Sequence, residues 1–264
     1  MQCGVAWFLH IGKTGGSTVE EHLRRGSALH GWMLHKLMND SAKPLGTWHH
    51  WYPYEGWNMS RGWLRVREIV SRSKRPKVIV MQHHTSPGVG EYLLANTLHD
   101  MRQELRHKGR DFVLATALRE PVARAISSIW FMKMRTNGPM DLPLYMDQLN
   151  SNYQTKYVLF SKHFAQQDGP WIWNASSDQQ LLGAAAAALR RFDLVGRTEQ
   201  LGAFLSRLDA RLGWVDVPAQ TKNRTPKKAQ GCLTADELQL VRERNRVDAQ
   251  LYDQFCAHDN SSKL

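Results

Sequence analysis

Residues 8–23 read FLHIGKTGGSTVEEHL, and this stretch decides the fold. Its apolar beginning predicts a buried strand over Ala6–His10, and a Gly-rich turn over Ile11–Gly16 follows. The residues from Ser17 to about Arg25 then predict an amphipathic helix. A strand, a turn and a helix in this order are typical of the first unit of an α/β fold.

The turn has the composition of an anion-binding cradle. Glycine lets the backbone approach an anion closely, and the first N–H groups of a helix have no partner inside it and point at negative charge. Gly15 and Gly16 allow the close approach, and Lys13 adds a mobile cation. The residues that we expect to line the anion are Lys13, Thr14, Gly15, Gly16, Ser17 and Thr18.

The same turn does not match the ATP-type P-loop, which needs G-x-x-x-x-G-K-[ST]. Gly12-Lys13-Thr14 would place the first glycine of that motif at position 7, where the chain has Trp7. This mismatch argues against the main catalytic alternative, a nucleotide or small-molecule kinase, which would also need a metal-binding carboxylate after a strand.

A second segment, FVLATALREPVARAISSIWFMK, repeats the strand–turn–helix order. It predicts a buried strand over Phe112–Leu118 and a helix that begins at Pro121. Arg119 leaves the end of the strand, and Ser127 lies two turns into the helix. A guanidinium fork and a hydroxyl placed in this way can hold one phosphate group.

Together, the two segments resemble the cofactor-binding signature of sulfotransferases that use 3′-phosphoadenosine 5′-phosphosulfate (PAPS). In that family the first element holds the 5′-phosphosulfate and the second holds the 3′-phosphate. The resemblance implies that Lys13 is both a cofactor-binding and a catalytic residue, which neutralises charge on the oxygen that sulfur leaves. It also implies that Arg119 and Ser127 bind the 3′-phosphate, whereas Arg124 is expected to point outward.

Later segments resemble the carbohydrate sulfotransferases, including the heparan 2-O and 6-O enzymes. These segments are residues 152–157 (NYQTKY), 192–199 (FDLVGRTE), 222–225 (KNRT), and the set Asn245, Asp248, Leu251 and Tyr252. The resemblance places Thr198 near the adenine, although a helix cap before Leu201 is an equal alternative. It places Lys222 and Arg224 in a loop over the nucleotide, with a solvated basic loop as the alternative. Gly12 departs from the family, which has proline there.

The transfer also needs a group that takes the proton from the acceptor hydroxyl. The apolar residues 77–81 predict a strand that leads to His83 and His84, and it resembles the family's strand ending in Gly-His, whose histidine is the proposed base. We therefore expect His84 to be the base, with a structural histidine as the alternative. Adjacent histidine pairs at 49–50 and 83–84 rarely converge on one ion, so we predict no metal site.

The alternation of strands and helices predicts an α/β, P-loop-like three-layer fold, with a central parallel sheet of about four to five strands flanked by helices. We expect residues 1–264 to form a single sulfotransferase domain. The other predicted elements are a strand at 194–196, helices at 91–106, 141–165, 178–191, 201–212 and 234–255, and an irregular region at 26–65.

The net charge of +11 favours anionic partners, namely the nucleotide cofactor and a hydroxyl acceptor on a carbohydrate. The basic residues form no block typical of nucleic-acid binders, but a non-catalytic polyanion-binding module remains an alternative. No stretch approaches the roughly 20 apolar residues of a membrane helix. The resemblance suggests the Golgi lumen and a membrane anchor, although the chain as given could be cytosolic. Cys232 and Cys256 are expected to be free thiols, since a predicted helix separates them.

Overall fold

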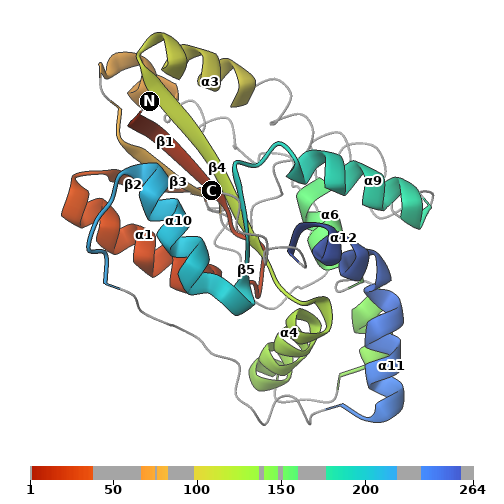
Figure 1. The fold of residues 1–264 in the computed structure, drawn as a ribbon. Helices are drawn as coiled ribbons and strands as arrows, with labels where there is room; N and C mark the ends of the chain where they lie inside the picture. The colour runs from red at the N-terminus through yellow and green to blue at the C-terminus, as the bar shows by residue number, and fades with distance from the viewer. Residues whose placement is uncertain are drawn as a thin grey trace.

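A parallel sheet of five strands lies at the centre of the described part of the chain (Figure 1). The computed structural model describes residues 2–37, 67–74, 76–82, 98–136, 140–147, 151–159, 177–218 and 233–256. The strands are β1 (Gln2–Leu9), β2 (Met33–Leu37), β3 (Val78–Gln82), β4 (Arg110–Leu118) and β5 (Leu194–Arg197). Their order is β2-β3-β1-β4-β5, and every neighbouring pair is parallel.

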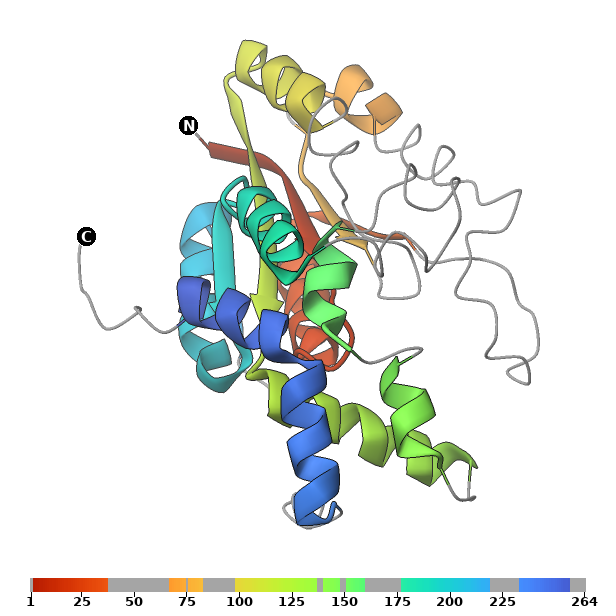
Figure 2. The ribbon, with the colours of Figure 1, turned by 90° about the vertical axis from the view of Figure 1, so that its right-hand side faces the viewer.

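Helices cover both faces of this sheet. Helices α1 (Gly16–His30) and α10 (Leu201–Leu212) pack on one face. The other face is covered by α3 (Leu98–His107), α6 (Tyr153–Leu159), α9 (Asp178–Leu189) and α12 (Arg246–Cys256). A third cluster joins α4 (Pro121–Thr136), α5 (Leu142–Tyr145) and α11 (Ala235–Arg244). Figures 1 and 2 show α4 and α11 beyond the ends at which the strands point.

The central strand explains why the sheet needs two helical layers. Successive side chains of a strand face opposite sides of the sheet. In β1, Trp7 faces the layer that contains α3, while Phe8 faces α1 and α10, and both are buried. A strand that is apolar on both sides is stable only between two covers. The predicted α/β fold class with a helix-flanked parallel sheet is therefore confirmed.

The predicted irregular region at 26–65 was partly wrong. Helix α1 continues to His30, where Gly31 in a left-handed conformation (φ 67°) donates its N–H to the Ser27 carbonyl. β2 then forms at the sheet edge, although His35 and Lys36 interrupt its apolar pattern. An edge strand tolerates such residues because it has a neighbour on one side only.

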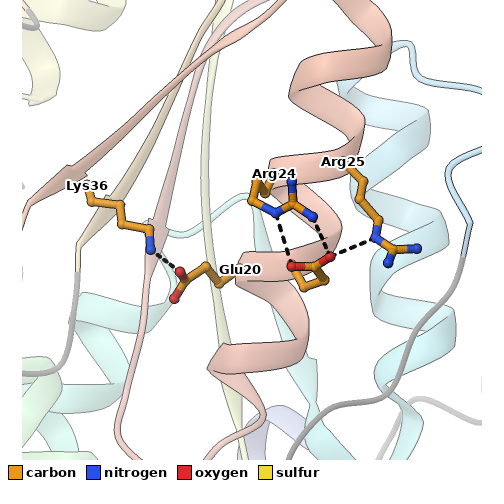
Figure 3. Close-up of polar contacts among 5 residues, drawn as sticks. Glu20, Arg24, Arg25 and Lys36 are labelled. Carbon is orange, nitrogen blue, oxygen red and sulfur yellow. Dashed lines mark hydrogen bonds and ion pairs between the residues drawn. The ribbon is translucent and has the colours of Figure 1, made fainter.

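Ion pairs fix the polar face of α1 (Figure 3). Glu20 pairs with Lys36 of β2, which ties the helix to the sheet edge. The buried Glu21 carboxylate accepts hydrogen bonds from Arg24 (2.7 and 3.1 Å) and Arg25 (2.8 Å). These contacts hold the helix whose N-terminus borders the Gly-rich turn.

The single helix predicted over 234–255 is two helices, α11 and α12. They meet at the buried Asn245, whose side-chain amide donates to the Val241 carbonyl (2.9 Å). Cys256 is buried at the end of α12, with its thiol 3.9 Å from the Gly196 carbonyl oxygen. Cys232 lies outside the described residues, so the free-thiol expectation stays a prediction.

None of the helices in the described ranges is long and apolar enough to cross a membrane. The expectation of a single domain over residues 1–264 also stays a prediction.

Candidate functional site

The loops that follow β1 and β4 meet at the carboxyl edge of the sheet. From β1 the chain crosses β3 to reach β2, whereas from β4 it moves in the other direction to β5. Open α/β sheets bind ligands at such a change of direction, beyond the carboxyl ends of the strands. The strand order therefore places the two predicted anion-binding segments side by side.

The Gly-rich turn is wound tightly enough to direct N–H groups outward. Lys13 and Gly15 both have positive φ (70° and 81°). Thr14 is buried, and its hydroxyl donates to the Ile11 carbonyl (2.8 Å). The Gly15 carbonyl accepts the first helical hydrogen bond, from Thr18 N–H (2.9 Å). The N–H groups before Thr18 thus lie at the start of α1, where a helix attracts anions.

The backbone at Gly16 lies against an imidazole, so a side chain at this position would force the His10 ring to move. A Cβ at this position would come within 1.8 Å of the His10 ring. His10 is itself buried, and its backbone N–H donates to the Gln82 carbonyl at the end of β3 (2.9 Å). Of the neighbouring residues, Thr18 is buried and Ser17 is half-buried.

Arg119 connects the two predicted segments directly. Its guanidinium donates to the Lys13 carbonyl (Nη1 to O, 3.2 Å). Its backbone N–H and carbonyl both pair with the side-chain amide of Gln154, at 2.9 Å each. These contacts hold the Arg119 side chain against the Gly-rich turn, so the two predicted phosphate-binding segments are in direct contact.

The expectation that Arg124 points outward was wrong. Its side chain is 1% exposed, and its guanidinium lies 4.4 Å from the ring centroid of Tyr153. Ser127, three residues later on the same helix, is also buried. The sequence could have predicted the burial of Arg124, since residues at i and i+3 share one face of a helix. If Ser127 faces the site, Arg124 lies on the same side.

The charges of three cations influence one another at this edge. Burial lowers the pKa of the Lys13 ammonium, and the Arg119 and Arg124 guanidinium groups lower it further. Burial also lowers the pKa of Arg119, although Glu199 and Glu120 act in the opposite direction. Lowered pKa values for neighbouring cations show that the protonated forms are disfavoured, and a bound anion would relieve this cost.

An exposed aromatic ring borders the cation cluster. The Lys13 ammonium lies 4.3 Å from the ring centroid of Phe131 on α4, and the Arg135 guanidinium lies 5.2 Å from it. Phe131 is 41% exposed. The ring therefore contacts two cations and is partly exposed to solvent.

Thr198 lies beside the Gly-rich turn. Its hydroxyl donates to the Leu118 carbonyl at the end of β4 (3.0 Å). A Cβ on Gly15 would lie 3.4 Å from the Thr198 methyl carbon. Thr198 begins a short 3-10 helix, η3 (Thr198–Gln200), and α10 has Gln200 at its N-cap, so the alternative that Thr198 caps α10 was wrong.

The structure thus brings together Lys13, Thr14, Gly15, Gly16, Arg119 and Thr198, and places Ser127 on the buried side of α4. His84, Lys222 and Arg224 fall outside the described residues, as do the tryptophans of residues 48–63. Within the described ranges, no three His, Cys, Asp or Glu side chains are grouped as metal ligands would be.

No family model and no curated protein matches the sequence. Among solved structures, the chain is similar to a sulfotransferase from Alicyclobacillus acidocaldarius, with 14% identity, a TM-score of 0.43 and 96% of each chain covered. It is also similar to mouse sulfotransferase SULT7A1 complexed with PAP, with 12% identity and a TM-score of 0.42, covering 98% of this chain and 88% of that one. A third similar structure is retinol dehydratase in complex with androsterone and the inactive cofactor PAP, with 11% identity and a TM-score of 0.40, covering 100% of this chain and 83% of that one. Since all three TM-scores are below 0.5, the site is interpreted from its own geometry.

Proposed function

We propose that the chain is a PAPS-dependent sulfotransferase. The observation that carries this proposal is the hydrogen bond from Arg119 to the Lys13 carbonyl, which joins two predicted phosphate-binding elements into one cationic site. In the proposal, the turn from Lys13 to Thr18 holds the 5′-phosphosulfate, and Arg119 with Ser127 holds the 3′-phosphate. Thr198 would lie near the adenine, and the loop that contains Lys222 and Arg224 would close over the nucleotide.

The proposed reaction is an in-line displacement at sulfur. The acceptor oxygen forms a bond to sulfur while the bond from sulfur to the bridging oxygen breaks, and adenosine 3′,5′-bisphosphate (PAP) leaves. Lys13 neutralises the negative charge that develops on the bridging oxygen. His84 takes the proton of the acceptor hydroxyl. This mechanism assigns charge neutralisation to side chains and needs no metal ion.

A carbohydrate is the acceptor that we propose. The net charge of +11 favours acidic acceptors, and Phe131 offers a partly exposed ring that contacts Lys13 and Arg135. An aromatic face can pack against a sugar ring, while the flanking cation can pair with a carboxylate or sulfate. A Golgi location and a membrane anchor stay predictions that the sequence resemblance implies.

A panel of neutral and acidic glycans, with small alcohols as controls, tests the acceptor when KM is measured over a salt series. A steep rise in KM with salt supports an acidic glycan, because surface charges are screened over about 8–10 Å. Sulfation of small alcohols alone would overturn the carbohydrate proposal and leave the sulfotransferase proposal intact.

Thermal stabilisation by ligands tests the sulfotransferase proposal. We expect PAP to raise Tm strongly and ATP with magnesium to raise it little. A preference for ATP with magnesium would support the kinase alternative, and no response to either would support the polyanion-binding alternative. The Arg119→Ala variant should lose most of the response to PAP, whereas Arg211→Ala, an exposed arginine on α10, should retain it.

A further inference from the structure

Two segments that are far apart in the sequence cap each other behind Arg119. The Asp248 carboxylate accepts hydrogen bonds from the N–H groups of Gln154 (2.9 Å) and Thr155 (2.7 Å) at the start of α6. In return, the Asn152 side-chain oxygen accepts from Val247 (3.0 Å) and Asp248 (3.3 Å) at the start of α12. Two of the free N–H groups at the start of each helix are thus satisfied by a residue at the start of the other.

This mutual capping fixes the position of Gln154. The side-chain amide of Gln154 accepts from the Arg119 N–H and donates to the Arg119 carbonyl, so both backbone groups of Arg119 are held. Gln154 is 1% exposed, which leaves the amide little freedom to reorient. Glutamine suits the position because one planar group supplies both the acceptor and the donor.

Asp248 also supplies a negative charge near the buried Arg124 guanidinium. It is 1% exposed, and its charge opposes the effect of burial on the pKa of Arg124. A buried cation without a nearby anion is strongly destabilising. One carboxylate therefore caps α6 and also allows a guanidinium to stay charged beneath the site.

The residue after Arg119 is held in a similar way. The Glu199 carboxylate accepts from the Glu120 N–H (3.0 Å) and from the Tyr252 hydroxyl of α12 (2.8 Å). Helix α12 thus braces two consecutive residues at the end of β4, through Gln154 on one side and through Glu199 on the other. A turn braced in this way has little freedom to change its backbone dihedral angles.

We propose that Gln154, held by Asp248, is a positioning residue that directs the Arg119 guanidinium at the 3′-phosphate of the nucleotide. This inference rests on the proposed function. It predicts an effect on one part of the ligand: loss of Gln154 should weaken recognition of the 3′-phosphate and leave recognition of the rest unchanged. A merely structural role would weaken the binding of every nucleotide alike.

The test compares PAP with 5′-AMP, which lacks the 3′-phosphate, by calorimetry. Gln154→Met keeps the side-chain volume and removes both hydrogen bonds to Arg119. We expect Gln154→Met to lower PAP affinity about 3- to 10-fold. Losing a hydrogen bond to a charged group directly would lower it roughly 10- to 100-fold, but Gln154 acts only through Arg119. AMP affinity should change less than about twofold. The matched control is Gln239→Met, since Gln239 is an exposed glutamine on α11.

Coupling to Arg119 provides the decisive measurement. If Gln154 acts through Arg119, the double variant Arg119→Ala/Gln154→Met should bind PAP no more weakly than Arg119→Ala alone. Additive losses, or equal losses for PAP and AMP, would overturn the inference. Circular dichroism and Tm establish that each variant is folded. If Gln154→Met does not fold, Gln154→Asn gives the same readout without adding charge, because its side chain is one methylene shorter and draws the amide away from the Arg119 backbone.

The same comparison extends to Asp248. Asp248→Asn also removes the anion near Arg124 and should therefore lower Tm, but among folded protein the loss of affinity should still be larger for PAP than for AMP. Asp253→Asn, an exposed position on the same helix, should change neither Tm nor affinity. Failure of the two proposals can be distinguished. If Arg119→Ala leaves the preference for PAP over AMP intact, the proposed role of Arg119 fails and the inference fails with it. If Arg119→Ala removes that preference while Gln154→Met retains it, only the inference is overturned.

Discussion

Replacing Lys13 with methionine should stabilise the unliganded protein while it removes activity. Burial and then the charges of Arg119 and Arg124 lower the pKa of the Lys13 ammonium. A lysine whose pKa is lower in the folded state destabilises the fold at neutral pH, and this cost declines as pH rises from the folded pKa to the ordinary value of 10.5. Lys13 is only partly buried, so screening limits the gain on removing its charge to about 0.5–1 kcal/mol.

This gain corresponds to a rise in Tm of about 1–4 °C for a chain of this size. Turnover should fall by about 10²- to 10³-fold, the usual effect of removing one preorganised group that stabilises developing charge. Scanning fluorimetry without ligand measures the first effect, and release of PAP from PAPS measures the second. Lys74→Met, at an exposed lysine outside the turn, is the control and should change neither.

Two results would refute this reasoning. A Tm that falls by several degrees would mean that the Lys13 side chain stabilises the turn, through its contact with Phe131. Turnover within threefold of the unmodified chain would mean that the ammonium does not act on the reacting oxygen. Either result would show that the lowered pKa of Lys13 is not evidence for a catalytic role.

Two further predictions concern the Gly-rich turn, and a third concerns His84, which lies outside the described residues. PAP affinity, measured by calorimetry, should decline as pH rises, and the decline should begin below the ordinary lysine pKa of 10.5. The reason is that the pKa of the Lys13 ammonium is lowered, so Lys13 loses its positive charge at a lower pH. In Lys13→Arg the decline should occur at higher pH. Gly16→Ala should cost about 1–3 kcal/mol of unfolding free energy in urea, because its Cβ has no room. Gly183→Ala, with nothing within 4 Å, should instead stabilise the protein by about 0.5–1 kcal/mol. His84→Ala should lower turnover by roughly 10²–10⁴-fold with little change in PAP affinity, and unchanged turnover would exclude His84 as the base.

The sequence predicts those parts of the fold and site that depend on neighbouring residues. The strand, turn and helix around Lys13 are contiguous, so hydrophobic periodicity and glycine position are enough to predict them. β2 could not be predicted in this way, because its His35 and Lys36 interrupt the apolar pattern, as charged and polar residues commonly do in edge strands. The break at Asn245 was also missed, since a single asparagine in a helical pattern does not by itself end a helix.

The contacts behind Arg119 join residues that are far apart in sequence. The resemblance singled out residues 152–157 and Asp248, but sequence spacing could not show that they contact each other. Gln154 and Asp248 are 94 residues apart, yet their hydrogen bond is part of the same network that holds Arg119. The sequence analysis predicted one helix over 141–165, whereas the structure has two separate helices there, α5 and α6. Neither the start of α6 near Gln154 nor the carboxylate that caps it was therefore predicted. Arg124 was mispredicted for the same reason. A charged residue is expected to be exposed, and only the folded structure shows that the Asp248 carboxylate offsets its burial. The long-range partner therefore decides whether such a residue belongs to the surface or to the site.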